Sequence, residues 1–235
     1  PQLLHASGIR PAALGRYLND HPQVVGLALL DQRLVPESAR KPRLPGRLDD
    51  VSGVSWIPYD RHVFPYHGQI MQLDTSPVPL GDVTEPWPGS IVGVGLFGCK
   101  DIQATDRVEF SDVEVDSFGM PAMTIHYELT CKDKETLAGM ASTVTELANA
   151  IGTPVDSPIV MPAGSSLHYM GTVRMGSVND GTSVCDTYGA VWDTEGLYVA
   201  GNGVIPTPTA CNPTATSVAL AIRSARQAVK HIARR

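Results

Sequence analysis

Three strand-like runs followed directly by a long amphipathic helix constrain the fold of this chain most strongly. The runs are separated only by turn residues and comprise IVGVGLFG (91–98), RVEFSDVEV (107–115) and PAMTIHYELT (121–130). Strands joined by short connections favour antiparallel pairing. The helix is predicted over residues 134–151, where apolar side chains recur at helical spacing and Gly152 follows as a stop signal. This order predicts an α+β unit, an antiparallel sheet with a packed helix.

Two segments before these runs also have the pattern of strands. Residues 24–30 (VVGLALL) predict a buried strand, and residues 64–73 (FPYHGQIMQL) alternate as a strand does. Residues 31–62 are rich in Pro, Arg and Asp without periodicity, which indicates a loop. Residues 74–90 hold four prolines and predict a long loop, of a kind that often covers a functional site.

The C-terminal part of the chain has an α/β pattern. LYVAGNGVIPT (197–207) predicts an apolar strand that ends in small residues. A helix is predicted after it, with Asn212 as the N-cap and Pro213 as the first helical residue. The apolar positions of this helix include Val218, Ala221, Ile222, Ala225, Val229 and Ile232. A strand, a glycine-rich turn and a helix N-terminus together form a place where an anion or an electron-rich ring can bind.

Composition and charge exclude several classes of protein. With 235 residues, of which 43% are hydrophobic and 18% charged, the chain can bury a sizeable core. A formal charge of −6 argues against nucleic acid or a polybasic membrane surface as a partner. No apolar run approaches the roughly 18 residues of a membrane span, and no signal-peptide pattern precedes the fold. Because the chain starts at Pro1 within a helical pattern, we expect an N-terminal part to be missing.

The four cysteines predict a reducing compartment rather than a zinc site. Cys99, Cys131, Cys185 and Cys211 are scattered without CxxC spacing. We therefore expect buried free thiols and a cytoplasmic location. His62, His67 and His126 have no ligand spacing either, so no metal site is predicted.

His168 stands out because it lies among small residues and glycines, in SSLHYMGTVRMG (165–176). Three roles are open to it from this stretch alone. It can be a structural hydrogen-bonding group, a metal ligand or a catalytic base.

Three motifs in fixed order resemble a known family. They are LHYMGTVRMG, VCDTYGAVWDTEGLYVAGNGVIPT and NPTATSVALAIRSA, and they resemble the C-terminal part of the glucose–methanol–choline (GMC) oxidoreductases. The match is closest to the pyranose oxidases and their bacterial glycoside-oxidising relatives. SGIRP, FPYHGQI and DRVEFSDVEVDSFGMPAMTIHYEL resemble the same subgroup.

The resemblance implies an FAD flavoprotein with a Rossmann-like flavin domain and a substrate domain built on an antiparallel sheet. The GxGxxG turn and ribose-binding acid of the family have no counterpart here, since no helix follows GVGLFG (93–98). The chain thus resembles a C-terminal half that is active only with its N-terminal FAD-binding half. It implies flavin-domain segments at 1–23 and 165–235 and a substrate-binding domain at 24–164.

The resemblance also assigns roles to individual residues. His168 is the base that takes the hydroxyl proton, and Asn212 is its partner, donating to the substrate oxygen. A structural hydrogen bond and simple N-capping are the respective alternatives. The residues placed against the cofactor are Gly201, Asn202, Gly203, Pro213 and Thr214. For the glycines the alternative is an ordinary tight turn.

Gln69 and Ser166 are the predicted substrate contacts. Gln69 is otherwise a strand residue that points to solvent. Met71 stands where fungal members of the family carry a histidine. We therefore expect the substrate to differ from theirs. Trp87, in the proline-rich loop, either stacks on a sugar or aglycone or anchors the loop by packing.

The predicted function is FAD-dependent oxidation of a secondary hydroxyl, at carbon 2 or 3, of a monosaccharide or glycoside. The electrons pass to O2 or a quinone. Glycosides with an aromatic aglycone, oxidised at carbon 3, are expected to be better substrates than glucose, and a plain pyranose oxidase is the alternative. Two further alternatives are a dehydrogenase of the same family with little O2 reactivity and a non-catalytic sugar-binding fragment.

Overall fold

The computed structural model describes residues 1–35, 37, 53–73 and 90–233. The chain divides into two compact units. The first contains Pro1–His21, Lys100–Thr130 and Ser166–Arg235, and the second contains Pro22–Cys99 and Cys131–Ser165. The second unit is a sheet with a helix, whereas the first is made of segments from three parts of the chain.

The second unit is built on a six-stranded antiparallel sheet, as the sequence predicts for the substrate domain. Its strands are β1 (Gln23–Leu30), β2 (Val54–Ile57), β3 (His67–Leu73), β4 (Ile91–Phe97), β7 (Gly152–Pro154) and β8 (Ile159–Val160). They are ordered β2-β3-β4-β1-β7, and β8 also pairs with β1. A 3-10 turn, η1 (Gln32–Leu34), follows β1.

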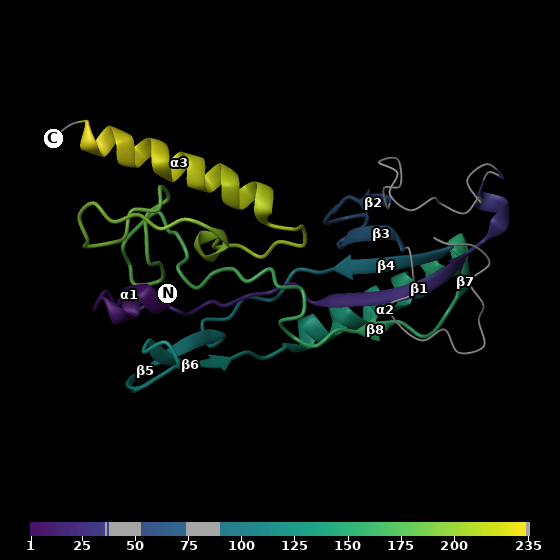
Figure 1. Ribbon diagram of the computed structural model, residues 1–235, viewed down its shortest axis with the longest axis horizontal. Helices are drawn as coiled ribbons and strands as arrows, with labels where there is room; N and C mark the ends of the chain where they lie inside the picture. The colour runs from purple at the N-terminus through teal and green to yellow at the C-terminus, as the bar shows by residue number, and fades with distance from the viewer. Residues whose placement is uncertain (36, 38–52, 74–89, 234–235) are drawn as a thin grey trace. The chain divides into compact units, whose positions relative to one another are not determined.

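Helix α2 (Cys131–Ile151) packs along β1 and β4 (Figure 1). The predicted apolar face is confirmed, because Leu137, Met140, Val144 and Ala148 are buried. Gly26 of β1 allows the close approach, since a β-carbon there would collide with the Val144 side chain. The helix therefore covers one face of the sheet.

The first unit has little regular structure apart from one hairpin and two helices. Its elements are α1 (Gln2–Ala6), β5 (Arg107–Val115), β6 (Pro121–His126), the 3-10 turn η3 (Asn202–Val204) and α3 (Thr214–Ile232). Buried side chains from distant parts of the chain form its core, namely Leu4, Ala13, Val173, Val184, Cys185 and Val204. This core joins the N-terminal and C-terminal segments of the unit, and the Lys100–Thr130 segment is tied to them by other contacts, such as the bond from Leu18 N to Asp106 O.

The expectation of one sheet from three consecutive strand-like runs is wrong. β5 and β6 pair with each other in a separate two-stranded sheet. The connection after β4 contains a buried ion pair, Lys100 Nζ to Asp106 Oδ2 at 2.8 Å. Lys100–Thr130 belongs to the same compact unit as the terminal segments, and the domain bounds 1–23, 24–164 and 165–235 stay a prediction.

Two other segment predictions also need correction. The expected loop at 31–62 contains η1 and strand β2, because Val54–Ile57 pairs with β3. The expected strand at 197–207 is reduced to a single bridge between Ala190 and Tyr198, followed by η3. Gly201 ends the extended run because its φ of 100° is a left-handed conformation. The predicted loop at 74–90, with Trp87, lies almost entirely outside the described residues.

Helix α3 begins one residue later than predicted. Pro213 stands at the N-cap position and no side chain caps the helix there. Its carbonyl accepts the first helical bond, from Ser217 N at 2.8 Å, because the fixed proline φ already suits a helix. The N-cap position of α3 is therefore Pro213 rather than the predicted Asn212.

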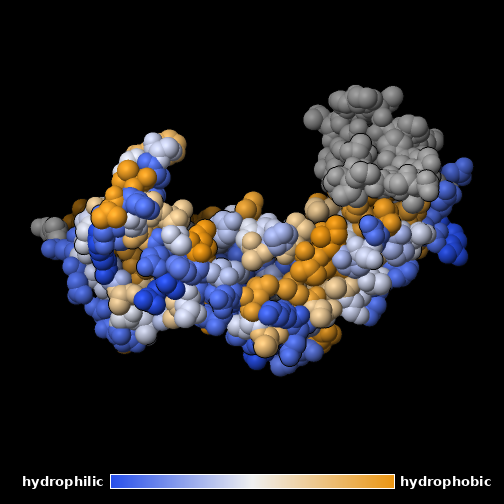
Figure 2. All heavy atoms as spheres, turned by 90° about the horizontal axis from the view of Figure 1, so that it is seen from below, coloured by the Kyte–Doolittle hydropathy of each residue, from blue (hydrophilic) through white to orange (hydrophobic). Residues whose placement is uncertain are grey.

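The apolar face of α3 is largely exposed, contrary to its amphipathic pattern. Its exposed residues include Val218, Ile222, Val229 and Ile232, at 49–71%. Figure 2 shows apolar side chains gathered in several patches on the face it presents. Within the described chain, Ser224 is the buried residue of this helix.

The cysteines form no disulfide, and only Cys185 is fully buried. Cys131 and Cys211 are exposed, so the expectation of buried thiols is wrong for them. In the part of the chain that the structure describes, no helix has both the length and the apolar character needed to cross a bilayer.

Candidate active site

His168 is held by a turn that the Asp20 carboxylate closes. The backbone N–H of His168 donates to Asp20 Oδ1 at 2.8 Å, and the Ser166 hydroxyl donates to the same oxygen. Leu167, between them, has a φ of 59°, a left-handed conformation that is uncommon for a branched residue. Asp20 is 1% exposed. A buried carboxylate thus fixes the backbone that carries the histidine.

Asp20 is itself held by the segment around β6. The Tyr127 hydroxyl donates to Asp20 O at 3.2 Å and accepts from Asp20 N at 3.3 Å. The Lys100 ammonium, paired with Asp106, lies 5.2 Å from the centroid of the Tyr127 ring. Asp106 also accepts from Leu18 N through its carbonyl at 2.9 Å. Residues 100–130 therefore support the site from within the same unit.

A second histidine, His21, lies directly against His168. Their Nδ1 atoms are 3.0 Å apart, and their rings meet edge to face at 63°. His21 Nε2 lies 3.0 Å from Thr209 Oγ1, and its backbone N–H donates to Ser166 Oγ at 3.2 Å. His21 is 3% exposed. The site thus contains a histidine pair.

Sequence reasoning missed His21. It lies 147 positions before His168 in the chain, and NDHP (19–22) is too short to predict which residue it meets. The signal was the adjacency of a carboxylate and a histidine, Asp20 and His21, next to a proline. That signal is common in loops, so only the fold reveals the contact.

The electrostatics favour a neutral His168. Burial lowers the pKa of the imidazole below its ordinary value of about 6.5, and the negative charge of Asp20 opposes this by raising it. The burial effect is the larger of the two. At neutral pH the ring therefore has a lone pair with which to accept a proton.

The chain segment that leads into α3 passes beside this pair. Thr209, which contacts His21, lies three residues before Asn212. Asn212 is half-buried and directly precedes the buried Pro213. The structure therefore brings the predicted base and the region of its predicted partner into the same unit.

Ser166, a predicted substrate contact, has two intramolecular hydrogen bonds, to Asp20 and from His21. These bonds give its hydroxyl a structural role. Gln69, the other predicted contact, lies in β3 of the other compact unit and is half-buried. Their contact with a sugar stays a prediction.

Trp56 is a further candidate that sequence reasoning missed. It lies in β2 directly opposite Gln69, so both side chains point to the same face of the sheet. Trp56 is 53% exposed and stacks on His67, with ring centroids 5.0 Å apart. Met71 is on the same face, two residues after Gln69. An amide and an exposed indole therefore lie on the same face of the sheet, in neighbouring strands.

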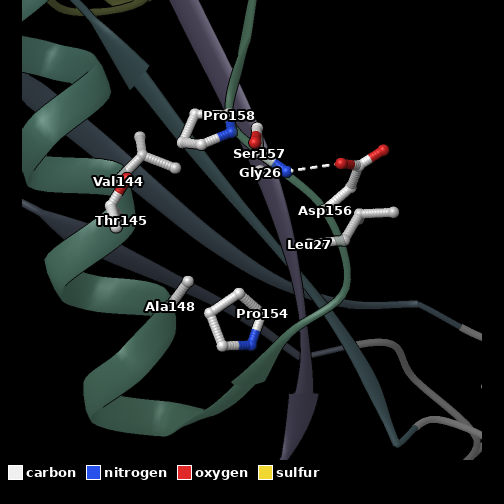
Figure 3. Close-up of a pocket in the computed structure, with 9 residues that line it drawn as sticks. All are labelled: Gly26, Leu27, Val144, Thr145, Ala148, Pro154, Asp156, Ser157 and Pro158. Atoms are coloured by element: carbon white, nitrogen blue, oxygen red, sulfur yellow. Dashed lines mark hydrogen bonds between the residues drawn. The ribbon is translucent and has the colours of Figure 1, made fainter.

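A cavity of about 280 Å³ lies in the sheet unit, between α2, β1 and the segment 154–158 (Figure 3). Val144 and Ala148 line it from the helix, and Asp156 is an acidic residue at its wall. The Asp156 carboxylate accepts from Ser157 N at 2.7 Å. Among the described residues its lining includes no histidine, so it offers no counterpart to the imidazole of His168.

Comparison with known proteins identifies the family. Residues 103–221 match the model of the GMC oxidoreductases. The chain belongs to the GMC oxidoreductase family. It is 54% identical, over 233 residues, to a C-glycoside 3-oxidase from Arthrobacter globiformis, an alignment covering 99% of this chain and 44% of that enzyme.

More distant relatives agree with this membership. A pyranose 2-oxidase from Tricholoma matsutake is 35% identical over 99% of this chain and 45% of its own length. A formate oxidase from Aspergillus oryzae shares the fold, with a TM-score of 0.60 and 14% identity over 92% of this chain and 47% of that one. This member of the GMC oxidoreductases therefore spans somewhat less than half the length of the relatives it matches.

The cofactor of the GMC oxidoreductases is FAD, and the residues predicted to meet it fit this group. A β-carbon on Gly201 would meet open space, whereas one on Gly203 would collide with Val173. Gly203 thus serves packing, and Gly201 leaves its backbone accessible. The first turn of α3 has no side-chain cap, so its N–H groups can donate to an anionic ring edge.

The turn at 201–204 is tied to the segment that follows His168. Val173 N donates to Gly203 O at 3.0 Å, and Met175 N donates to Val204 O at 2.9 Å. The accessible glycine and the histidine thus belong to one hydrogen-bonded framework in this GMC oxidoreductase unit.

Proposed function

We propose that the enzyme containing this chain oxidises a secondary hydroxyl of a glycoside to a ketone, at carbon 3 of the sugar. FAD, when bound, supplies the oxidant that accepts the hydride. The observation that carries the proposal is the half-buried His168, whose lowered pKa favours the neutral ring and which contacts Asp20 and His21. The names of relatives at 54% and 35% identity support a sugar as substrate.

His168 performs the acid–base part of the reaction. Its imidazole accepts the proton of the sugar hydroxyl while the C–H hydrogen leaves with its electron pair, and the C–O bond becomes C=O. The Asn212 amide donates to the same oxygen as negative charge develops there. In the second half-reaction, protonated His168 stabilises negative charge while O2 or a quinone takes the electrons.

Two backbone elements hold the cofactor in this proposal. Gly201, Asn202 and Gly203 meet its ring system along their backbone. Pro213 and Thr214 would present the N-terminus of α3, whose partial positive charge would favour an electron-rich ring. The N-terminal FAD-binding half of the same enzyme supplies the nucleotide site and covers the exposed apolar face of α3, since apolar stripes of this kind mark contact surfaces.

Substrate choice rests on the sheet face that carries Gln69. Gln69 stays the predicted sugar contact, and Trp56 lies opposite it on the same face of the sheet. Met71 adds a soft apolar surface where the fungal relatives have an imidazole. Glycosides with an aromatic aglycone are therefore expected to have a higher kcat/KM than glucose.

The test is a competition between glucose and an aryl C-glycoside with the FAD-loaded enzyme, with the position of the new ketone determined by NMR. Oxidation of the glycoside at carbon 3 with formation of hydrogen peroxide is the expected result. Preference for glucose with attack at carbon 2 would identify a plain pyranose oxidase. Turnover with a quinone but without peroxide would identify a dehydrogenase, and no turnover with either acceptor would contradict the proposal.

A further inference from the structure

We infer that His21 is a positioning residue that fixes the tautomer of His168, and that Thr209 fixes the tautomer of His21 in turn. This inference rests on the proposed function of His168 as the base. It extends that proposal by naming the groups that decide which nitrogen of His168 accepts the substrate proton.

The close contact of the two rings leaves only two arrangements. Two Nδ1 atoms 3.0 Å apart share one proton, so one ring donates and the other accepts. A neutral imidazole carries its proton on one nitrogen and its lone pair on the other. If His168 donates from Nδ1, its Nε2 carries the lone pair. If His168 accepts at Nδ1, its Nε2 carries the proton and cannot act as a base.

Thr209 favours the first arrangement. Its hydroxyl lies 3.7 Å from Met170 Sδ, and a thioether sulfur can only accept. With the hydroxyl proton directed at the sulfur, Thr209 Oγ1 accepts from His21 Nε2–H at 3.0 Å. His21 Nδ1 is then unprotonated and accepts from His168 Nδ1–H. All three hydrogen bonds run in one direction, from His168 to Met170.

The same arrangement serves the protonated state. When His168 Nε2 takes the hydroxyl proton, its Nδ1–H still donates to His21 Nδ1, so no hydrogen bond has to reverse. The buried Asp20 carboxylate favours the new positive charge, and its bond to His168 N holds the backbone still. His21 must stay neutral throughout, because two facing imidazolium rings would repel.

The experiment uses the FAD-loaded enzyme with ¹⁵N-labelled histidine and matched variants. His21→Phe keeps a ring but removes both nitrogens, and His21→Asn places an amide oxygen near the position of Nδ1. Thr209→Val removes the hydroxyl, whereas Thr209→Ser keeps it. The ¹⁵N spectrum reports the tautomer of His168, assigned by its loss in His168→Ala, and stopped-flow measurement against pH reports flavin reduction.

We expect the Nδ1–H tautomer of His168 in the wild type, Thr209→Ser and His21→Asn, and a mixture of tautomers in His21→Phe and Thr209→Val. Flavin reduction should fall by about 10²-fold in His21→Phe, within the range for a misplaced general base. His21→Asn should recover most of this loss. The acid limb of the pH profile of flavin reduction should also move in His21→Phe. Asp20 is then the charged group that the structure places near the His168 ring.

Several results would overturn the inference. These are an Nε2–H tautomer of His168 in the wild type, an unchanged tautomer in both His21→Phe and Thr209→Val, or a rate within threefold of wild type in His21→Phe. If His21→Phe does not fold, the ¹⁵N spectra of the wild type and of Thr209→Val still test the tautomer of His168. Failure of the proposed function is distinct, since His168→Ala would then leave flavin reduction unchanged whatever His21 does.

Discussion

At the scale of the residue, the site depends on a balance between burial and one carboxylate. Burial disfavours the imidazolium form of His168, whereas Asp20 favours it. The result is a base whose pKa lies below its ordinary value, so that it is neutral when the reaction starts. Asp20 also holds the turn at 166–168, and it thus acts on both the charge and the position of the base.

Replacement of His168 by Ala tests the chemical role. We expect flavin reduction at saturating glycoside to slow by about 10²–10⁴-fold, the usual loss of a general base. FAD should remain bound, because the proposed cofactor contacts are backbone groups at 201–203 and 213–214. Stopped-flow absorbance measures the rate. His126→Ala is the control, because His126 pairs with Glu109 on the β5–β6 hairpin. If both variants had an equally small effect on flavin reduction, His168 would be a structural residue.

The pH dependence of flavin reduction tests the charge of Asp20. Protonation removes the lone pair of His168, so the rate should decline only as pH falls below about 6.5, given the lowered pKa. Asp20→Asn keeps the hydrogen-bond acceptor but removes the charge that raises this pKa. The acid limb should therefore move to lower pH. The control variant Asp156→Asn should leave the acid limb in place. A move of the limb to higher pH in Asp20→Asn would contradict the idea that the Asp20 charge raises the pKa of His168.

At the scale of the element, the connection between β4 and β5 fixes the position of the β5–β6 hairpin within its unit. It carries Lys100 and Asp106, with side chains 0% and 2% exposed, which form a buried ion pair. Asp106 Oδ1 also accepts from Glu128 N at 2.9 Å. The pair therefore fastens the β5–β6 hairpin to the segment that holds Asp20.

Removal of one partner should destabilise the fold strongly. Asp106→Asn takes away the carboxylate that faces the Lys100 ammonium, and loss of one member of a buried pair costs about 3–5 kcal/mol of unfolding free energy. Urea denaturation of the FAD-loaded enzyme is the measurement. Asp31→Asn, which breaks an exposed pair with Arg33, should change the midpoint little. Similar midpoints for the two variants would contradict the importance of the buried pair.

At the scale of the whole molecule, the described residues form an antiparallel sheet unit and a unit assembled from three separated segments. The apolar face of α3, in the unit of three segments, is largely exposed. The matched relatives are more than twice as long as this chain, which spans 44% and 45% of them. In the proposed function, the N-terminal FAD-binding half covers this face of α3.

We expect that residues 1–235 alone do not retain FAD. Their sequence offers the flavin end of the site, at 201–203 and 213–214, whereas its GxGxxG match at 93–98 lies along strand β4 with no helix after it and so does not form a pyrophosphate-binding turn. The visible absorption of the purified polypeptide after gel filtration with excess FAD is the measurement, with the full-length enzyme as the control. Stoichiometric, slowly dissociating FAD on residues 1–235 would refute the expectation.

The local sequence pattern was sufficient to predict those features that depend on residues close together in the chain. The apolar spacing of α2 predicted its buried face, and the runs at 24–30, 64–73 and 91–98 predicted strands of an antiparallel sheet. The ordered motifs around His168 and Asn212 indicated the GMC oxidoreductase family, which the comparisons confirm. These features depend on periodicity and on short-range residue order, which a linear chain displays directly.

Only the tertiary structure decided which distant residues meet. The contact of His21 with His168 spans 147 positions, and that of His21 with Thr209 spans 188. Similarly, no local signal separates the β5–β6 hairpin from β4, because the buried Lys100–Asp106 pair that does so resembles ordinary surface charge in the sequence. Side-chain hydrogen bonds and buried charges join residues that are far apart in the sequence, and they follow no periodic pattern. The sequence by itself therefore determined the main strands, helix α2 and the family. The surroundings of His168 were determined only by the folded chain.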